Sequence, residues 1–315
     1  MEIIRSLKEL RRDPDNVITV GTFDGVHRGH RFIIQELKRF AEQWQGRAVV
    51  VTFDPHPQIV LAGKDRPPIH ILTTTEQKLA LLDKLGVEKT IVIPFTREFS
   101  RMSSEDYVQD VLYNTIGLKG IVIGYDHAFG RDRQGSIDTL KTFARVKGFY
   151  VEQLPPLEIQ GQIISSTLIR KKIAAGEVEK ANRCLDYAYT IRGMVIRGEG
   201  RGRKLGFPTA NIELENPYQL IPADGVYVVT VKLPSGLYQG MANIGFRPTF
   251  NGRHRSVEVH ILDFDADIYD ERLEMSFYKR IRAEQKFTSL HALIQQLEKD
   301  REATRTYFSE KTLSV

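Results

Sequence analysis

A β-branched run that leads into glycines and histidines is the feature that most constrains this chain. Residues 17–20 are rich in Val, Ile and Thr, which predicts a strand, and apolar residues recur at helical spacing over residues 32–44. The junction between them contains residues without a side chain: Gly21, Gly25 and Gly29. Glycines let the backbone approach a ligand closely, and the amides and dipole of a new helix favour an anion. The junction therefore predicts a nucleotide site.

Two histidines, His27 and His30, lie at the start of the predicted helix. If the helix begins near His27, both imidazoles share one face and can reach a single triphosphate. An ordinary surface pair is the alternative, because this spacing alone is weak evidence of a site. The glycine-rich context favours the nucleotide site.

Length and charge narrow the class of protein. A chain of 315 residues predicts two domains, and its net charge of +5 suits small anionic ligands as well as nucleic acid. The sequence has no apolar signal core and no run near the ~18 apolar residues of a membrane span. The single cysteine, Cys184, excludes an internal disulfide and a cysteine-based zinc site, and we expect it to be a small buried residue. We therefore expect a cytoplasmic protein.

The first half of the chain alternates apolar β-like runs with helical patterns. Strands are expected at residues 48–53, 90–95, 120–124 and 149–154, and helices at residues 76–85, 103–112 and 136–146. Strands that are apolar throughout and separated by helices predict a parallel sheet covered on both faces. In such sheets ligands bind beyond the carboxyl ends of the strands.

The pattern changes after about residue 184. Alternating strands are expected at residues 226–233, 237–244, 256–262 and 273–282, which favours an antiparallel arrangement. A terminal helix over about residues 289–308 suits a cap over an open barrel. We place the boundary between Gly176 and Tyr189 and predict two domains, residues 1–183 and 184–315.

Three further loops follow predicted strand ends in the first half. His56 lies between two prolines that stiffen a turn, and Asp126 lies with His127 and two aromatic residues in the loop 124–130, which suits a planar ring with a polar edge. Hydroxyls and a cation that suit a pyrophosphate follow: Ser165, Ser166, Thr167 and Arg170. Each loop has an alternative interpretation. The loop of His56 can be a rigid surface turn, the aromatic residues of the loop 124–130 can fill a core, and residues 165–170 can be a plain helix cap with a solvated basic face.

A glycine-rich basic loop opens the second half. Its backbone amides and a cation can surround phosphates, through Gly198, Gly202, Lys204 and Gly206. It is not a Walker A loop, and a solvated basic loop or an RNA contact is the alternative. Thr209 and Asn211 point the same way from an extended segment, so both can face Mg²⁺, which prefers oxygen ligands. Glu258, in an alternating strand, can accept the proton of an attacking hydroxyl, although a solvated strand face is the default interpretation.

Taken together, these segments resemble the bacterial bifunctional riboflavin kinase and FAD synthetase family over nearly the whole chain. Its adenylyltransferase module is similar to three segments: residues 21–30, the loop 124–130 and residues 165–170. The first segment contains the His-x-Gly-His sequence at 27–30. Its riboflavin kinase module is similar to residues 205–211, 243–250, 258–269 and 282–287. The resemblance implies an α/β chain: a Rossmann-like nucleotidylyltransferase domain with a parallel sheet, then an antiparallel six-stranded β-barrel with a terminal helix.

The resemblance also implies two ATP-dependent steps that need Mg²⁺. The second half phosphorylates riboflavin to FMN with Glu258 as the base, and the first half joins FMN to AMP to give FAD. His27 and His30 stabilise the charge that grows as pyrophosphate leaves, and Thr209 and Asn211 bind Mg²⁺. The implied ATP or phosphate contacts are Gly21, Phe23, Asp24, Gly29, Ser165, Ser166, Thr167, Arg170, Gly198, Gly202, Lys204 and Gly206. The implied flavin contacts are Asp126, Arg282 and Glu284.

Two other functions fit parts of the sequence. The chain can be an adenylyltransferase for another phosphorylated acceptor with a regulatory second half. It can also be a non-catalytic RNA-binding protein on a nucleotide-binding fold, with residues 198–204 as the contact. We favour a flavin enzyme with riboflavin, FMN and ATP as partners, and expect no membrane or nucleic-acid partner and a monomer.

Overall fold

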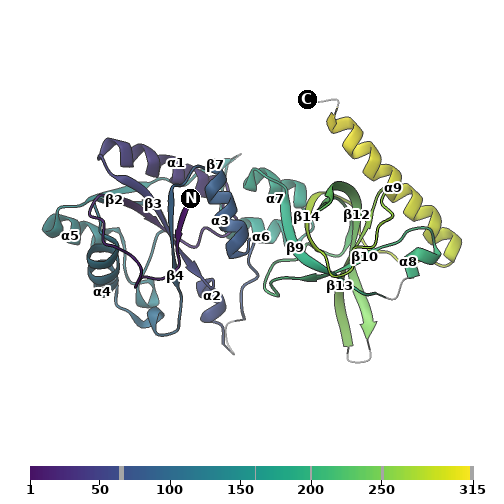
Figure 1. The fold of residues 1–315 in the computed structure, drawn as a ribbon, viewed down its shortest axis with the longest axis horizontal. Coiled ribbons are helices and arrows are strands. Elements are labelled where there is room, and N and C mark those ends of the chain that lie inside the picture. Colours follow the sequence, from purple (N-terminus) through teal and green to yellow (C-terminus); the bar gives the residue numbers. More distant parts are fainter. Residues whose placement is uncertain (64–66, 160, 199–200, 250–251, 313–315) are drawn as a thin grey trace. The chain divides into compact units, whose positions relative to one another are not determined.

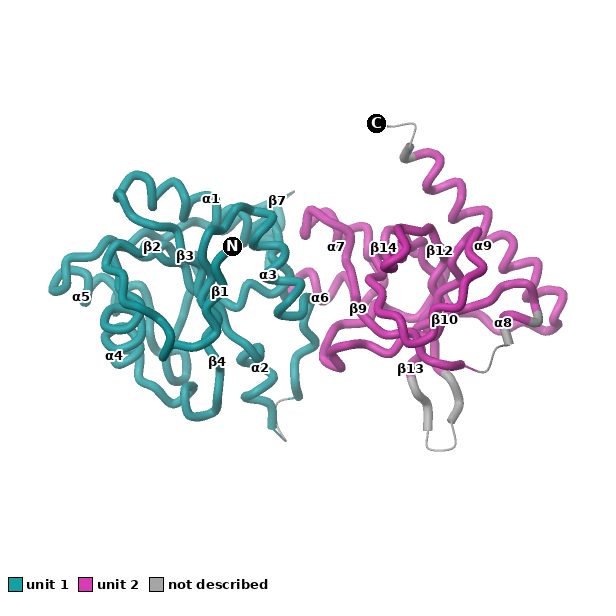
Figure 2. Tube along the Cα trace, in the orientation of Figure 1, with its two compact units in different colours: residues 1–166 teal, residues 167–315 magenta. Residues whose placement is uncertain are grey.

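The computed structural model describes residues 1–63, 67–159, 161–198, 201–249 and 252–312, without the side chains of residues 201, 204, 247–249, 252–254, 311 and 312. The chain forms two compact units, Met1–Ser166 and Thr167–Val315 (Figure 2). The first unit contains a parallel sheet and the second a closed antiparallel barrel, so the predicted α/β fold class is confirmed. The predicted division into domains 1–183 and 184–315 stays a prediction.

The first unit is built on a six-stranded parallel sheet (Figure 1). Its strands, in spatial order, are β1 (Glu2–Ile4), β4 (Lys89–Pro94), β3 (Arg47–Asp54), β2 (Asn16–Val20), β5 (Gly120–Gly124) and β6 (Tyr150–Leu154). The expected strands are all present. The short edge strand β1, which pairs with β4 alone, was not expected from the sequence.

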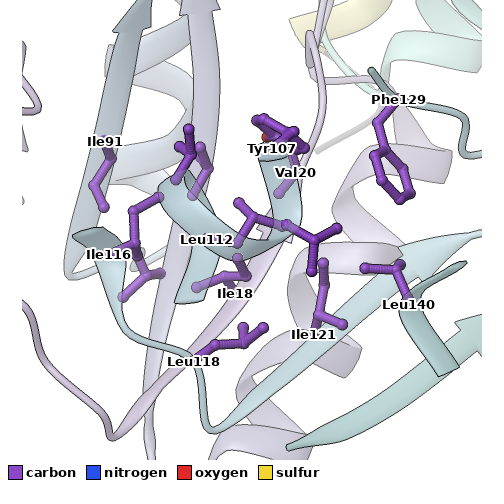
Figure 3. Packing of buried hydrophobic residues seen from close by; sticks show 14 of the residues in the cluster. Ile18, Val20, Ile91, Tyr107, Leu112, Ile116, Leu118, Ile121, Phe129 and Leu140 are labelled. Atoms are coloured by element: carbon purple, nitrogen blue, oxygen red, sulfur yellow. The ribbon is translucent and has the colours of Figure 1, made fainter. Parts of the chain in front are cut away.

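Alternate residues of these strands point to opposite faces, and each face has its own helices. Val17 and Val50 pack with α1 (Arg28–Gln43) and with Leu82 of α3 (Thr75–Lys84). On the other face Ile18, Ile91 and Ile121 pack with Leu112 and Ile116 of the π-helical segment η2 (Tyr107–Ile116), as Figure 3 shows. The helix α5 (Ile137–Lys147) covers the same face through Leu140. The remaining elements of this unit are α2 (Pro57–Val60), η1 (Phe99–Arg101), α4 (Ser104–Asp106), η3 (Arg131–Arg133), β7 (Glu158–Ile159) and β8 (Gln162–Ile163).

Cap residues mark the ends of two helices of the first unit. A capping box formed by Thr74 and Gln77 begins α3, and Ser136 caps α5. Gly86 and Gly148, with φ angles of 69° and 77°, follow the last turns of these helices, where a left-handed residue closes the backbone. These helix boundaries are confirmed to within a few residues.

The second unit begins with α6 (Ser166–Ala174, which starts at the junction) and α7 (Val178–Leu185), followed by the barrel. The barrel strands, in spatial order, are β10 (Ala210–Leu214), β13 (Gly252–Ile261), β12 (Gly236–Thr249), β11 (Gly225–Leu233), β14 (Arg272–Arg282) and β9 (Tyr189–Ile196). The order closes because β9 pairs with both β10 and β14. The short helix α8 (Arg201–Lys204) lies between β9 and β10.

The terminal helix α9 (Leu290–Thr312) packs against β11 and β12 of the barrel (Figure 1). Its residues Ile294 and Leu297 contact a small buried cluster formed by Phe207, Val226 and Met241. The predicted terminal helix on the barrel is confirmed, but the barrel is closed and not open, because β9 pairs on both sides. Cys184 is buried in α7, as expected.

Candidate active sites

The loop between β2 and α1, residues 21–27, has an unusual backbone. Phe23 and Val26 have positive φ angles, 48° and 35°, which bulky and β-branched residues rarely adopt. The Phe23 ring folds over Gly21, where a Cβ atom would lie 3.2 Å from a ring carbon. Backbone strain of this kind clusters at ligand sites, where the surrounding structure enforces it. The β2–α1 loop is therefore a candidate ligand site.

Asp24 is the main anchor of the β2–α1 loop. Asp24 is only 3% exposed. Its carboxylate accepts hydrogen bonds from the backbone N–H groups of Leu72 and Thr73, at 2.9 and 3.0 Å. Its backbone carbonyl accepts a hydrogen bond of 2.9 Å from the Ser166 hydroxyl. The Asp24 carboxylate is therefore engaged within the protein, and holds the loop.

The predicted residues His27, Gly29 and His30 come together at the start of α1. The Nδ1 atom of His27 accepts a hydrogen bond from the His30 backbone N–H at 3.3 Å, so the neutral His27 ring carries its proton on Nε2 and can donate it. The His30 ring stacks on the His27 ring with centroids 3.6 Å apart. A Cβ atom at Gly29 would lie 3.2 Å from two His27 ring atoms. This geometry combines imidazole donors with the amides of a helix N-terminus.

The loop 124–130 after β5 supplies polar and aromatic groups. Asp126 is exposed. Burial of the His127 ring, together with the charge of Arg133, lowers the pKa of His127 to about 4. His127 is therefore neutral at physiological pH. His56, in the other stiff loop, caps α2 by accepting a hydrogen bond from the Gln58 N–H at 3.2 Å.

A row of aromatic rings joins these loops, and sequence reasoning missed most of it. Neighbouring ring centroids are 5.7 to 6.3 Å apart between β3, η1 and η2, and 5.8 Å apart between η2 and the loop 124–130. The rings belong to Phe53, Phe95, Phe99, Tyr107 and Phe129. Phe53 and Phe95, at and just after the carboxyl ends of β3 and β4, are the signal that could have revealed it.

The predicted phosphate-binding hydroxyls fall on both sides of the unit boundary. Ser165 and Ser166 belong to the first unit, and Ser166 contacts the β2–α1 loop. Thr167 is exposed and Arg170 is half-buried in α6, and both belong to the second unit. The Ser166 hydroxyl therefore joins this segment to the β2–α1 loop.

A cavity of about 290 Å³ lies in the second unit. Thr209 and Glu258 both line it, and the Thr209 hydroxyl donates a hydrogen bond of 3.2 Å to Glu258 Oε2. Glu258 pairs in register with Asn211 on β10 and with Asn243 on β12, so these side chains share one face of the barrel wall. Asn243, to which the sequence analysis gives no role, also lines the cavity and lies two residues from Met241 on β12.

His260 fixes the segment that carries Thr209. Its Nδ1 lies 2.7 Å from the backbone oxygen of Pro208, and its ring packs edge-on against Phe207 with centroids 5.3 Å apart. Burial lowers the pKa of His260. The neutral ring can therefore donate from Nδ1 to the Pro208 carbonyl.

The glycines of the loop 198–206 allow close packing around the same segment. A Cβ atom at Gly198 would overlap the side-chain amide of Asn211, and one at Gly202 would overlap the backbone oxygen of Phe207. Gly206 has a positive φ angle of 80°. The Lys204 side chain lies outside the described residues.

Arg282 and Glu284 both line the cavity. The Arg282 guanidinium donates to the Asp300 carboxylate of α9 through Nε at 3.0 Å and through a terminal nitrogen at 2.8 Å. The Glu284 carboxylate packs on the backbone of Gly245, where a Cβ atom would overlap it. Arg282 therefore forms a cavity wall while it ties α9 to β14.

Two family models match the chain. Residues 9–168 match the model described as FAD synthetase, and residues 185–308 match the model described as riboflavin kinase. The chain belongs to the bifunctional riboflavin kinase/FMN adenylyltransferase family. The predicted family, its two activities and the transferase class are confirmed, and riboflavin, FMN and ATP are the substrates of this family.

Relatives of this family align with almost the full chain. The bifunctional riboflavin kinase/FMN adenylyltransferase of Listeria monocytogenes is 40% identical over 95% of this chain and 94% of its own length. The Escherichia coli K12 protein of the same name is 34% identical over 98% of each chain. A solved structure titled as a macrolide-efflux protein from Streptococcus pneumoniae has a TM-score of 0.85 and 34% identity, and covers 96% of this chain and 98% of its own. Within the described ranges, no helix has both the length and the apolar content that a membrane crossing needs.

Proposed function

We propose that each half of this family member carries one half-reaction, with the residue roles given below. The kinase reaction belongs to the barrel cavity, and the adenylyl transfer belongs to the β2–α1 loop. The observation that carries the proposal is that each family model coincides with its own polar site, Glu258 with Thr209 in one and His27 with His30 in the other.

In the kinase half, Glu258 is the base. Its carboxylate accepts the proton of the riboflavin 5′-hydroxyl, the hydroxyl oxygen forms a bond to the γ-phosphorus of ATP, and ADP leaves. The hydrogen bond from Thr209 orients the carboxylate at the cavity wall. Apolar cavity residues, including Phe207, Val226 and Met241, suit the isoalloxazine ring, and Arg282 and Glu284 add polar groups at its edge.

In the adenylyltransferase half, no side chain needs to act as a strong base. An ionised phosphate oxygen of FMN forms a bond to the α-phosphorus of ATP, and the bond to the bridging oxygen breaks as pyrophosphate leaves. His27 and His30 hold the negative charge that grows on pyrophosphate, as do Ser165, Ser166, Thr167 and Arg170. The loop residues Gly21, Phe23, Asp24 and Gly29 act by shaping the backbone that receives the phosphates.

The flavin of the second step fits the loop 124–130. The aromatic row that ends at Phe129 offers planar apolar contacts to an isoalloxazine ring. Asp126, which is exposed beside this row, is the proposed polar contact at the ring edge.

The kinase site has donors that fit Mg²⁺. Thr209 and Asn211 supply hydroxyl and amide oxygens next to the Glu258 carboxylate. In the described part of the chain no group of three or more His, Cys, Asp or Glu side chains could hold a metal ion, which fits an ion that is held together with the phosphate oxygens of ATP and water. When bound, Mg²⁺ neutralises part of the phosphate charge, and Gly198, Gly202, Lys204 and Gly206 line the approach of the phosphates.

The proposal is tested by separating riboflavin, FMN and FAD after incubation of the full chain. With riboflavin, ATP and Mg²⁺ we expect FMN and then FAD, and with FMN supplied we expect FAD and pyrophosphate. Chelation of Mg²⁺ should stop both steps. Unchanged riboflavin would contradict the proposal, and adenylylation of a different phosphorylated acceptor in place of FMN would favour the alternative transferase.

A further inference from the structure

Lys78 is a buried cation next to the adenylylation site, and none of the roles above uses it. It lies on α3, and the residue is 6% exposed. Its Nζ donates to the backbone oxygens of Thr22 and Phe53, each at 3.1 Å, and to the hydroxyl oxygen of Thr52 at 2.9 Å. The Thr52 hydroxyl in turn donates to the Thr22 oxygen at 3.2 Å.

These contacts connect two loops of one site. Thr22 belongs to the β2–α1 loop, whose other anchor is the Asp24 carboxylate. Phe53 lies near the carboxyl end of β3 and begins the aromatic row that suits the flavin ring. One ammonium group therefore fixes the proposed phosphate loop against the proposed flavin wall.

The number of hydrogen bonds matters for the protonation state. An ammonium group has three N–H donors, whereas a neutral amine has two. Only the charged form can donate to all three oxygens while the Thr52 hydroxyl keeps its own bond to Thr22, and a lost hydrogen bond in a buried network is costly. Loss of the proton therefore removes at least one of the four hydrogen bonds of this network, because the neutral amine either gives up one acceptor or takes the Thr52 hydroxyl away from Thr22.

We propose that Lys78, in its protonated form, is a positioning residue for adenylyl transfer, which holds the β2–α1 loop against the end of β3 so that ATP and FMN meet in line. The inference rests on the proposed function of this half of the chain. Lys78 does not touch the reacting atoms. It acts through the backbone of Thr22 and Phe53, and misplacement of a substrate by about 1 Å can cost a hundredfold in rate.

The charged groups around Lys78 set where it titrates. Burial lowers the pKa of Lys78 to about 8, against the opposing effects of Asp24 on the β2–α1 loop, Asp54 at the end of β3 and Glu76 on α3. The value of kcat/KM reports the titration of the free enzyme. We therefore expect kcat/KM for ATP in FAD formation to fall as the pH rises through about 8.

The contribution of Lys78 to the free energy of unfolding changes with pH in the opposite direction to the activity. The pKa of Lys78 is about 8 in the folded chain and 10.5 in the unfolded chain. Between pH 8 and pH 10.5 the unfolded state therefore binds more protons than the folded state. The contribution of Lys78 to the free energy of unfolding therefore increases with pH in this window. An activity loss there, without a loss of folded protein, points to positioning.

The experiment compares pH profiles of FMN adenylylation in the full chain. Lys78→Arg keeps a permanent charge and several donors, so we expect a lower kcat/KM without the fall above pH 8. Lys78→Met removes all three bonds, and we expect kcat/KM to drop by roughly tenfold to a hundredfold with no alkaline fall. Thr52→Val leaves two acceptors, which a neutral amine can satisfy, so its alkaline fall should be weaker.

The controls separate positioning from folding. Lys84→Met changes an exposed lysine on the same helix and should leave the profile unchanged. Circular dichroism shows whether each variant is folded, and riboflavin phosphorylation should be unaffected in all of them. A Lys78→Arg variant with the alkaline fall of the wild type, or a folded Lys78→Met variant with wild-type kcat/KM, would overturn the inference. A wild-type chain that makes no FAD from FMN and ATP would instead refute the proposed function.

Discussion

At the scale of single residues, the adenylylation site depends on how closely the α1 backbone approaches the His27 ring. Gly29→Ala would place a methyl group 3.2 Å from two ring atoms of His27, so the stacked pair with His30 must shift. We expect kcat/KM for FAD formation to fall by roughly tenfold to a hundredfold. The helix itself should not suffer, because Ala favours a helix over Gly by about 1 kcal/mol. Product formation from FMN and ATP measures the effect.

Gly63→Ala is the matched control for this substitution. Apart from its chain neighbours, no atom of the described residues lies within 4 Å of the position of its Cβ, so FAD formation should be unchanged. Equal rates for wild type and Gly29→Ala would show that the His27 geometry does not limit the reaction.

The kinase site makes a second prediction at this scale. Glu258→Gln keeps the volume of the side chain and an oxygen that accepts the Thr209 hydrogen bond, but it removes the base. We expect kcat for riboflavin phosphorylation to fall by about 10²–10⁴-fold, with FAD formation from supplied FMN unchanged. Glu213→Gln, on an exposed position of β10, should change neither rate. A Glu258→Gln variant with undiminished kinase turnover would exclude the base role.

At the scale of elements, a buried ion pair between Arg282 and Asp300 joins α9 to β14. Asp300 is fully buried. Its carboxylate accepts hydrogen bonds from the Arg282 guanidinium, and a further one of 2.9 Å from the Gln296 amide. Asp300→Ala leaves the Arg282 charge without its partner, which we expect to destabilise the second unit by about 3 kcal/mol. The KM for riboflavin should also rise, because Leu293 and Leu297 of α9 line the cavity. Thermal unfolding together with kinase kinetics measures both effects.

The first unit serves as the internal control for Asp300→Ala. Its core does not include α9, so FAD formation from FMN should persist below the unfolding temperature of the variant. An unfolding temperature equal to that of the wild type would mean that the ion pair contributes little to the free energy of unfolding.

The elements also show how far sequence reasoning reaches. The strands β2 to β5 were predictable because each contains a nearly continuous apolar run, and β6, which contains Glu152 and Gln153, because it follows the helix α5 and its Gly148. The sequence predicts no strand at β9, although its residues alternate between buried and partly exposed, because Arg192 and Gly193 obscure the apolar pattern. Gly193 is needed there because a Cβ would overlap the Ile212 side chain of β10, a contact that no local pattern contains.

The same limit applies to the candidate sites. The histidines, the glycines and Glu258 could be found from motifs, since each motif is continuous in the sequence. Lys78 and the pair of Arg282 with Asp300 could not, because their partners come from other elements, and an isolated lysine or arginine is by default expected to be solvated. Groups that hold a site in shape are thus harder to predict than groups that contact the substrate.

At the scale of the whole molecule, the two half-reactions lie in units with separate cores. Cutting the chain after residue 183 would not separate them cleanly, because α7 packs on β9 and β14 and buries Val178, Ala181 and Leu185. Point substitutions in the full chain are the better way to isolate each activity.

Two such variants should complement each other in a mixture. Glu258→Gln lacks the proposed base and should make no FMN. His30→Ala should make FMN but adenylylate it slowly, because His30 stacks on His27 beside the helix amides. Neither alone should convert riboflavin to FAD at an appreciable rate. Mixed, they should form FAD after a lag, because FMN released by one chain is adenylylated by the other, and the lag should shorten as protein concentration rises. The double variant Glu258→Gln/His30→Ala is the control and should stay inactive. If the mixture forms no FAD while added FMN is converted normally by Glu258→Gln, FMN does not leave the chain that makes it, and the two sites are not independent.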